Sequence, residues 1–474
     1  MIHQYDIIVI GAGSAGLSTA LFTGKAGLKT LLIDKSEQNI GGDCLNSGCV
    51  PSKALIHVSR ILHSACQATQ FGLSLSGRPD IEKVLGHVKQ AQSEIRKHEN
   101  SKYLATQGID VALGEASFVD RKSVQVEDKI YSAPKIVIAT GSRPSRPTIP
   151  GIEMVRTFNN ESIFDITELP SRMLVIGAGP VGVEMAQVFR RLSSEVTLVG
   201  RNEKILPADP QEITDILEQL LVHEGIAIHT GSQIDRFISS SACTLKDNND
   251  IERTIEFDAV FLATGRSFHL EALKLERAGV HVENDHIKND LRLATTNPHI
   301  FVCGDVAGRH MFSHAAEHHA RVLLNNFISP IKQKIDDRMS WVTFSDPQIA
   351  TFGNPEIHLK KFGRRYEKLV LDFNKDDRAV VDDYRYGKLV LLVTPKNLWG
   401  RQRILGGSMI APQAGEMIQE IIMAMNNSLD IKVLFDKIYP YPVASRVNQF
   451  IIVNHQEKRL TSGIKKFLRF LFRL

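Results

Sequence analysis

The sequence predicts an α/β fold with two Rossmann-like dinucleotide-binding domains and a C-terminal α+β domain. Three observations lead to this prediction. A glycine-rich turn follows a short apolar strand twice, at residues 11–16 and again at residues 177–182. The chain has 474 residues, which leaves room for about three domains, each with its own core. A mixed strand and helix pattern continues beyond Met339.

The first glycine turn has the surroundings of a dinucleotide-binding unit. An apolar run at residues 6–10 leads into the turn, and a helical pattern then leads to a second strand. We expect Gly11 to make the tight turn, Gly13 to let backbone N–H groups approach a pyrophosphate, and Gly16 to allow close helix–strand packing. Asp34, at the end of the second strand, is expected to bind a ribose hydroxyl.

The second glycine turn, Gly177-Ala-Gly179-Pro-Val-Gly182, lies between the same elements but lacks the acid. Gly200 stands at the end of its second strand and Arg201 follows. An acid there would bind a 2′-hydroxyl and repel a 2′-phosphate, so its absence removes a repulsion and Arg201 offers a cation. The unit is therefore predicted to favour NADPH over NADH, with a solvated turn residue as the alternative for Arg201.

Cys44 and Cys49 lie five positions apart in a chain with five cysteines. On a regular helix such residues are about 7.5 Å apart along the axis, whereas a disulfide needs Cα atoms about 4.4–6.8 Å apart. A bond between them requires a distorted start of the helix, for which Gly48 supplies freedom. Such a short-looped bond would be reducible, as suits catalysis. Zinc binding and two unpaired thiols are the alternatives.

Two nucleotide sites and a cysteine pair predict an electron relay from nicotinamide to flavin to disulfide. Two strands that end in Thr140-Gly141 and at Gly265 are each expected to close a nucleotide-binding region. A further strand ends at Gly304-Asp305, where the carboxylate is expected to accept hydrogen bonds from a ribityl hydroxyl.

Charge and hydropathy exclude several classes of protein. The net charge is +4, but six basic residues and no acid follow Glu457, so the rest of the chain is net negative and nucleic-acid binding is not predicted. No apolar run reaches transmembrane length and no secretory signal is recognised, so a cytoplasmic location is expected. Few cysteines agree with a reducing compartment.

The C-terminal tail predicts a short basic amphipathic helix. This helix is expected either to dock on its own dimer or to contact an anionic membrane surface, which would make the protein peripheral to the membrane. Apolar residues recur at helical spacing and basic residues lie mainly on another side: Ile464, Phe467, Leu468, Leu471 and Leu474 against Lys465, Lys466, Arg469 and Arg473.

Together these motifs resemble those of the flavoprotein disulfide reductases, which include dihydrolipoamide dehydrogenase, glutathione reductase and mercuric reductase. The resemblance runs from about Tyr5 to about Phe450. It implies bound FAD, an NAD(P)H domain inserted into the FAD domain, and a homodimer. The implied domains are FAD-binding residues 1–148 and 266–336, NAD(P)H-binding residues 149–265, dimerisation residues 337–457 and a basic tail at 458–474.

The resemblance also assigns roles to four residues. Cys44 matches the interchange thiol that meets the substrate, and Cys49 matches the thiol against the flavin, which forms a charge-transfer complex when reduced. Lys53 matches the lysine near flavin N5, and Glu184 matches its carboxylate partner. Such a pair would stabilise the negative charge that develops as hydride arrives. A solvated helix residue is the alternative for Lys53.

The chain departs from the family near its C-terminus. The disulfide-reducing members carry His-Pro-Thr there and a Glu three residues later, and the histidine is a base from the partner subunit. Here Tyr441 and Arg446 take those two places, and a phenol is a poor base at neutral pH. Mercuric reductase is similar in having a tyrosine, yet it has a C-terminal cysteine pair, and this chain has no cysteine after Cys303.

The predicted enzyme therefore passes electrons from NAD(P)H through FAD and the cysteine pair to a small-molecule acceptor that needs little help from a base. The alternatives are dihydrolipoamide dehydrogenase or another small-disulfide reductase, and a metal-ion or membrane quinone reductase.

Three histidines and three further cysteines are interpreted as structural. His314, His318 and His319 fall on a predicted helix after Asp305, where packing or flavin contacts are expected and no metal site is predicted. The remaining cysteines are interpreted as small buried hydrophobic residues: Cys66, Cys243 and Cys303.

Overall fold

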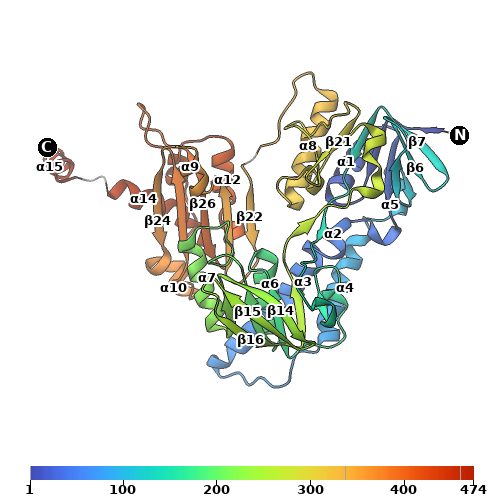
Figure 1. The fold of residues 1–474 in the computed structure, drawn as a ribbon. Coiled ribbons are helices and arrows are strands. Elements are labelled where there is room, and N and C mark those ends of the chain that lie inside the picture. The colour runs from blue at the N-terminus through green and yellow to red at the C-terminus, as the bar shows by residue number, and fades with distance from the viewer. Residues whose placement is uncertain (1, 337, 459–460, 474) are drawn as a thin grey trace. The chain divides into compact units, whose positions relative to one another are not determined.

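The computed structural model describes residues 2–336, 338–458 and 461–473. Figure 1 shows the chain from its N-terminus in blue to its C-terminus in red. The chain divides into two compact units, and the first division falls between Gly177 and Ala178, inside the second glycine turn. The predicted domain boundaries stay predictions. Unit 1 comprises Met1–Gly177, Val188–Thr197 and Gln233–Asp336, and unit 2 comprises Ala178–Gln187, Leu198–Ser232 and Asp337–Leu474.

The first sheet of unit 1 is parallel and has the order β21-β8-β2-β3-β4. Strands β2 and β3 are buried at every residue, as expected of a parallel sheet with both faces covered. The helices α1 (Ser14–Lys25) and α8 (Ser313–Ile328) pack against each other. The strands are β2 (Ile7–Ile10), β3 (Thr30–Asp34), β4 (Ile109–Leu113), β8 (Lys135–Ile138) and β21 (Ile300–Val302).

A helical hairpin follows the cysteine segment. The short helix α2 (Gly42–Asn46) precedes α3 (Cys49–Gln67), and α3 packs along α4 (Ile81–Arg96), beside which it is labelled in Figure 1. Beyond α5 (Ser101–Thr106), unit 1 adds a four-stranded sheet in the order β1-β7-β6-β5. Its strands are β1 (Ile2–Gln4), β5 (Ala116–Phe118), β6 (Ser123–Val126) and β7 (Lys129–Ser132).

The second glycine turn belongs to a sheet with the order β10-β17-β11-β12-β13. Helix α6 (Pro180–Arg191) follows the turn, and α7 (Gln211–His223) precedes β13. The strands are β10 (Thr157–Phe158), β11 (Arg172–Ile176), β12 (Glu195–Val199), β13 (Ile226–His229) and β17 (Ala259–Leu262). Smaller sheets are formed by β14 (Ser232–Ser239), β15 (Ala242–Asp247) and β16 (Glu252–Glu256), by β9 (Arg143–Pro144) and β18 (Arg266–Ser267), and by β19 (Val282–Glu283) and β20 (His286–Ile287).

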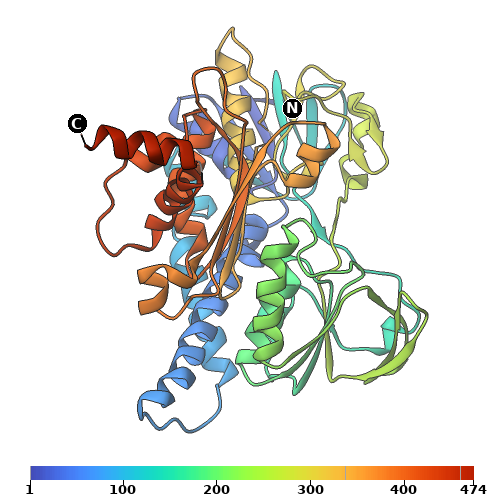
Figure 2. The same cartoon turned by 90° about the vertical axis from the view of Figure 1, so that its left-hand side faces the viewer.

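The C-terminal part of unit 2 is an antiparallel sheet in the order β22-β23-β26-β25-β24, drawn in orange in Figure 2. Helices α11, α12 and α14 contact it and share its core. Its strands are β22 (Ser340–Thr343), β23 (Gln348–Gly353), β24 (Glu367–Asp372), β25 (Lys388–Val393) and β26 (Ile404–Ala411). Its helices are α9 (Glu356–Lys361), α10 (Asp377–Val381), α11 (Ala414–Met417), α12 (Gln419–Asn426), α13 (Lys432–Asp436) and α14 (Val447–Glu457).

The tail forms the predicted helix, α15 (Ser462–Leu471), which is the darkest red helix in Figure 2. The Thr461 hydroxyl accepts a hydrogen bond from the Ile464 N–H at 3.4 Å and caps its start. Arg459 and Leu474, which the sequence places in this tail, lie outside the described residues. Within those residues, no helix is long and apolar enough to cross a membrane.

Candidate functional site

The first glycine turn leaves no room for side chains at two of its glycines. A Cβ on Gly11, which has a φ of +104°, would lie 2.4 Å from the carbonyl oxygen of Ala139, and one on Gly16 would lie 1.8 Å from the Gly11 oxygen. Helix α1 begins at Ser14 with no side-chain cap and no acid in its first turn. An uncapped helix start without negative charge fits the pyrophosphate of FAD, because its N–H groups attract anions.

Asp34 joins the end of β3 to this turn. Its buried carboxylate accepts hydrogen bonds from the Ala12 N–H at 2.5 Å, from the Lys35 N–H at 2.7 Å and from the Asn39 amide at 2.5 Å. Each carboxylate oxygen can accept more than one hydrogen bond, so the predicted ribose contact fits this arrangement and stays a prediction. Sequence reasoning missed Asn39, which lies in no recognised motif.

Gly304 brings Asp305 to the first turn of α1. With a φ of +81°, Gly304 lies so close that a Cβ would be 3.0 Å from the Cβ of Ala15. The Ser142 hydroxyl, directly after Gly141, donates to Asp305 Oδ2 at 2.5 Å, while burial raises the pKa of the Asp305 carboxyl. The two strand ends predicted to line a flavin site therefore meet in unit 1.

Arg266 connects this meeting point to the cysteine segment. It follows Gly265, and its guanidinium donates to the Ser142 hydroxyl at 2.6 Å and to the Ser142 carbonyl at 2.9 Å. It also forms ion pairs with Asp43 Oδ2 at 3.2 Å and Asp305 Oδ2 at 3.7 Å. Sequence reasoning named Gly265 and missed Arg266, although a cation next to a closing glycine was a readable signal.

The helix is interrupted between Cys44 and Cys49, as predicted. Cys44 lies in α2, and Cys49 is the first residue of α3. Between them, Gly48 adopts φ −116° and ψ −109°, and a Cβ there would lie 2.9 Å from the carbonyl oxygen of Asp43. Both cysteines carry free thiols, which are hydrogen-bonded to each other.

The surroundings of the two thiols are unequal. The hydrogen bond from Cys44 lowers the pKa of Cys49 to about 6 against the opposing effect of burial, and the Ser313 hydroxyl and the charge of Lys53 act in the same direction as the bond. Ser313 Oγ lies 3.3 Å from Cys49 Sγ. The start of a 19-residue helix also favours a negative charge at Cys49. The shared hydrogen bond and burial raise the pKa of Cys44.

This arrangement therefore favours the thiolate at Cys49 and the proton at Cys44. Sequence reasoning missed Ser313, which lies 264 positions from Cys49 and follows no recognised motif.

Lys53 lies one helical turn after Cys49 on α3, so the two side chains share a face. Glu184 is buried in unit 2, where its Oε1 accepts from the Phe344 N–H at 2.8 Å. Its pairing with Lys53 would join the two units and stays a prediction.

The second glycine turn repeats the tight geometry of the first. Gly177 has a φ of +114°, and a Cβ there would lie 2.2 Å from the carbonyl oxygen of Ala263. At Gly179 a Cβ would meet nothing within 4 Å, which leaves space for a ligand to approach its backbone. Gly182 lies within α6.

The missing acid at the end of β12 has a packing reason. A Cβ on Gly200 would lie 2.6 Å from the Cβ of Ala178, so no side chain fits there without movement of the turn. Arg201 is the next residue and its side chain is exposed. The predicted contact of Arg201 with a 2′-phosphate stays a prediction.

Tyr441 lies on an exposed segment of unit 2 with defined contacts. Its hydroxyl donates to Asp377 Oδ2 at 3.2 Å, and the Arg446 guanidinium lies 5.4 Å from the centre of its ring. Two residues earlier, Tyr439 donates to Glu420 Oε1 at 2.6 Å. Asp377 and Glu420 were not predicted, because nothing in the sequence links them to this segment. The predicted approach of Tyr441 to Cys44 of a partner subunit stays a prediction.

The three histidines of α8 make three different contacts. His319 is fully buried and accepts from the Gly304 N–H at 3.3 Å, His314 stacks on a neighbouring phenylalanine, and His318 accepts from the Asp336 N–H at 3.2 Å. In the parts of the chain that the structure describes, no three His, Cys, Asp or Glu side chains are grouped to hold a metal ion.

The interpretation of the remaining cysteines is right for two and wrong for one. Cys243 and Cys303 are buried, and burial raises the pKa of each thiol to about 12. Cys66 is exposed near the end of α3. The prediction failed because that end of the helix is covered by few other residues, which composition does not reveal.

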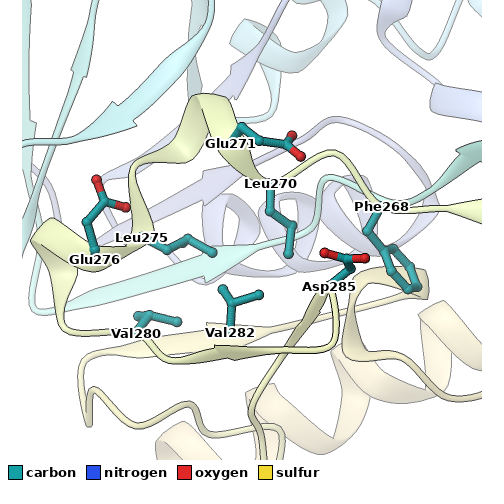
Figure 3. Close-up of a pocket in the computed structure, with 8 residues that line it drawn as sticks. All are labelled: Phe268, Leu270, Glu271, Leu275, Glu276, Val280, Val282 and Asp285. Atoms are coloured by element: carbon teal, nitrogen blue, oxygen red, sulfur yellow. The ribbon is translucent and has the colours of Figure 1, made fainter.

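A hollow of about 310 Å³ lies elsewhere in unit 1. Figure 3 shows Leu270, Leu275 and Val282 pointing toward one another across it. None of the predicted site residues lines it. It is separate from the cysteine and glycine-turn residues and takes no part in the arrangement above.

Comparisons with known proteins agree with the predicted family and fold class. Residues 5–320 match the pyridine nucleotide-disulphide oxidoreductase family, and residues 339–449 match its dimerisation domain. The mercuric reductase of Staphylococcus aureus is 31% identical over 92% of this chain and 80% of its own length. The dihydrolipoyl dehydrogenase of Mycoplasma genitalium is 29% identical over 94% of this chain and 97% of its own length.

Solved structures of similar fold include a disulfide reductase from Escherichia coli. The HOCl-induced flavoprotein disulfide reductase RclA is 27% identical, with a TM-score of 0.82 over 94% of this chain and 98% of that one. A Cu(II) complex of RclA also has a TM-score of 0.82, with 26% identity over 95% of this chain and 99% of that one.

Proposed function

The chain belongs to the pyridine nucleotide-disulphide oxidoreductase family, and from this premise we propose that it passes electrons from NADPH through FAD and the Cys44–Cys49 pair to a small-molecule acceptor. The predicted fold class and the resemblance to flavoprotein disulfide reductases are confirmed. The dimerisation domain supports a homodimer, and the family supports bound FAD. The choice of NADPH, the acceptor and the location in the cell are proposals.

The residues of unit 1 fit FAD. The uncapped start of α1 after Gly13 would hold the pyrophosphate, Asp34 a ribose hydroxyl and Asp305 a ribityl hydroxyl. Arg266 positions Asp305 by its ion pair and by sharing Ser142. When bound, FAD accepts two electrons from the nicotinamide and passes them to a disulfide.

The unequal thiols carry the proposal. Two electrons and one proton convert the Cys44–Cys49 disulfide into one thiolate and one thiol, as the S–S bond breaks. The hydrogen bond, the helix start and Ser313 all favour Cys49 as the thiolate. Cys44 then carries the proton and is the sulfur that reacts with the acceptor once that proton leaves. Oxidation of the pair by two electrons re-forms the S–S bond.

As acceptor we propose a thiophilic, reducible metal ion. Exchange with a disulfide requires a base to take a proton from the attacking thiol, whereas a metal ion displaces thiol protons on binding. Tyr441, which donates to Asp377, is a weak candidate for that base. One NADPH supplies the two electrons that reduce one Hg²⁺ to Hg⁰ or two Cu²⁺ to Cu⁺, and one proton is released. The similarity to mercuric reductases and to a Cu(II) complex supports this choice.

Anaerobic stopped-flow reoxidation tests the acceptor. Protein reduced by one equivalent of NADPH is mixed with Cu²⁺, Hg²⁺, lipoamide, glutathione disulfide or menadione, and flavin absorbance is followed. We expect the metal ions to reoxidise it at least about 100-fold faster than the disulfides, since the disulfides lack general-base help. Cys44→Ser is the control and should lose this reaction. Fast lipoamide reduction would instead assign the chain to the small-disulfide reductases, and menadione reduction that survives Cys44→Ser would assign a quinone reductase.

A double change tests the argument from the missing base. Tyr441→His together with Arg446→Glu should raise lipoamide turnover by roughly 10²–10⁴, because it restores a base and its orienting acid. Metal-ion turnover should change little. Efficient lipoamide reduction by the unaltered protein, with no gain from the double change, would contradict the argument.

A further inference from the structure

We propose that unit 2 carries a two-part surface that binds anionic membranes, formed by helix α15 and the turn of the β25–β26 hairpin. The turn comprises residues 394–403. Both parts combine exposed large apolar side chains with clustered basic ones, and the hairpin lies beside the helix from which the tail emerges. This membrane-binding surface does not depend on which electron acceptor the protein uses.

Helix α15 has one apolar side and one basic side. None of its described residues is buried, and Phe467 and Phe470 are 60% and 62% exposed. At 100° per residue, the basic residues share one side of the helix, while four apolar residues share the opposite side and one phenylalanine flanks it. The basic residues are Lys465, Lys466 and Arg469, the opposite side holds Ile464, Phe467, Leu468 and Leu471, and the flanking residue is Phe470. Phe472 and Arg473 follow the helix directly.

The hairpin turn presents a second apolar tip. Leu398 and Trp399 are 101% and 86% exposed. The tip is held in place, because Asn397 Oδ1 accepts from the Trp399 N–H at 3.0 Å and from the Arg401 N–H at 2.9 Å. The basic residues Lys396, Arg401 and Arg403 flank this tip in the sequence. Tryptophan favours the boundary between lipid and water, where its ring is buried and its N–H stays hydrated.

The two parts are held close by the chain itself. His455, in the last turn of α14, lies 3.2 Å from Gln402 Oε1, and Gln402 donates to the Thr394 carbonyl at 2.9 Å across the base of the hairpin. Thr461, which precedes α15, is three positions after Lys458. Three residues span at most about 11 Å. The start of α15 therefore lies near the end of α14 and the base of the hairpin.

Charge and composition favour anionic lipid as the occupant. No acid follows Glu457, and the hairpin turn also carries basic residues without an acid. Basic residues next to apolar and aromatic ones suit a surface of anionic headgroups above acyl chains. Membrane binding grows with the apolar area buried in the interface and with the attraction to anionic lipids, so two such elements bind more strongly than one. Helix and hairpin provide two elements on one subunit, and a homodimer doubles them.

Vesicle sedimentation tests the surface with the full-length, FAD-loaded protein. We expect it to sediment with vesicles of phosphatidylcholine and phosphatidylglycerol and not with pure phosphatidylcholine. Phe467→Ser with Phe470→Ser, and separately Leu398→Ser with Trp399→Ser, should each weaken binding at least about tenfold. Replacement of Lys465, Lys466 and Arg469 by serine should weaken it roughly 100-fold at low salt. Phe362→Ser, at an exposed phenylalanine of the same unit, is the matched control and should change nothing.

Fluorescence tests the hairpin independently of the tail. Trp399 is one of two tryptophans, and its emission should shift to shorter wavelength when anionic vesicles are added. Trp399→Phe should lose the shift and keep sedimentation, since it preserves an apolar tip. The proposal is overturned if the full-length protein does not sediment with anionic vesicles, or if neither pair of serine changes weakens binding. It is also overturned if removal of residues 461–474 dissociates the dimer without affecting vesicle binding, because α15 then covers a second copy.

Discussion

The two glycine turns share one backbone geometry and differ in what joins the end of the next strand to the turn. In the first, the buried carboxylate of Asp34 accepts the Ala12 N–H. In the second, Ala178 takes the place of Ala12 in the motif, and its Cβ packs so closely on Gly200 that no side chain fits. The difference shows that packing inside the turn constrains which side chain the end of the next strand can carry.

The largest expected effects separate the two turns. Gly11→Ala should abolish FAD binding, because its Cβ would collide with the Ala139 carbonyl, and the protein should purify colourless. Gly177→Ala should keep FAD but reduce the rate of flavin reduction by NADPH at least about 100-fold, while dithionite still reduces the flavin. Absorbance spectra and stopped-flow traces measure both.

A matched control separates collision from backbone strain. Gly72 has a φ of +90° and nothing within 4 Å of its Cβ position. Gly72→Ala should therefore cost about 1 kcal/mol of folding free energy and leave both cofactors bound. If the Gly177→Ala protein lost FAD, or if the Gly11→Ala protein kept it, the two turns would not have separate roles.

The next effect concerns Arg201. If its guanidinium pairs with a 2′-phosphate, Arg201→Ala should lower kcat/KM for NADPH by roughly 10- to 100-fold, the effect of losing one charged hydrogen bond. The value for NADH should stay nearly constant, and Arg201→Lys should recover part of the loss. Equal losses with both cofactors would contradict a phosphate contact. A substitution at Gly200 gives no clean test, since it would disturb Ala178.

Sequence reasoning reached what lies in local patterns. Both glycine turns, the interruption at Gly48 and the amphipathic tail follow from spacing within a few residues of chain, and the structure contains all four. It did not reach Ser313 or Arg266, because their partners are far away in sequence and any of many serines or arginines could have filled those places. Polar networks depend on tertiary packing, which a single sequence does not display.

A smaller effect is expected at Asp34, the acid at the end of the strand that follows the first glycine turn. Asp34→Asn preserves shape but replaces a carboxylate that accepts three hydrogen bonds with an amide that has one acceptor oxygen. Leaving a buried N–H without a partner costs about 1–3 kcal/mol, so we expect roughly tenfold weaker FAD binding by equilibrium titration. NADPH binding to the apoprotein should be unchanged. A loss shared by both cofactors would mean that Asp34 acts on overall stability.

The smallest effect is expected at Ser313 and tests the proposed thiolate form of Cys49. The thiolate–flavin absorbance of the reduced enzyme should be present above the pKa of Cys49, about 6, and fade as the pH falls through it. The Ser313 hydroxyl stabilises the thiolate from 3.3 Å, so Ser313→Ala should raise this pKa and move the midpoint to higher pH. Ser313→Thr keeps the hydroxyl and should restore the original midpoint. Because an alanine that merely loosened α8 would alter FAD affinity without moving the midpoint, the pH titration distinguishes the two roles, and an unmoved midpoint would remove Ser313 from the relay.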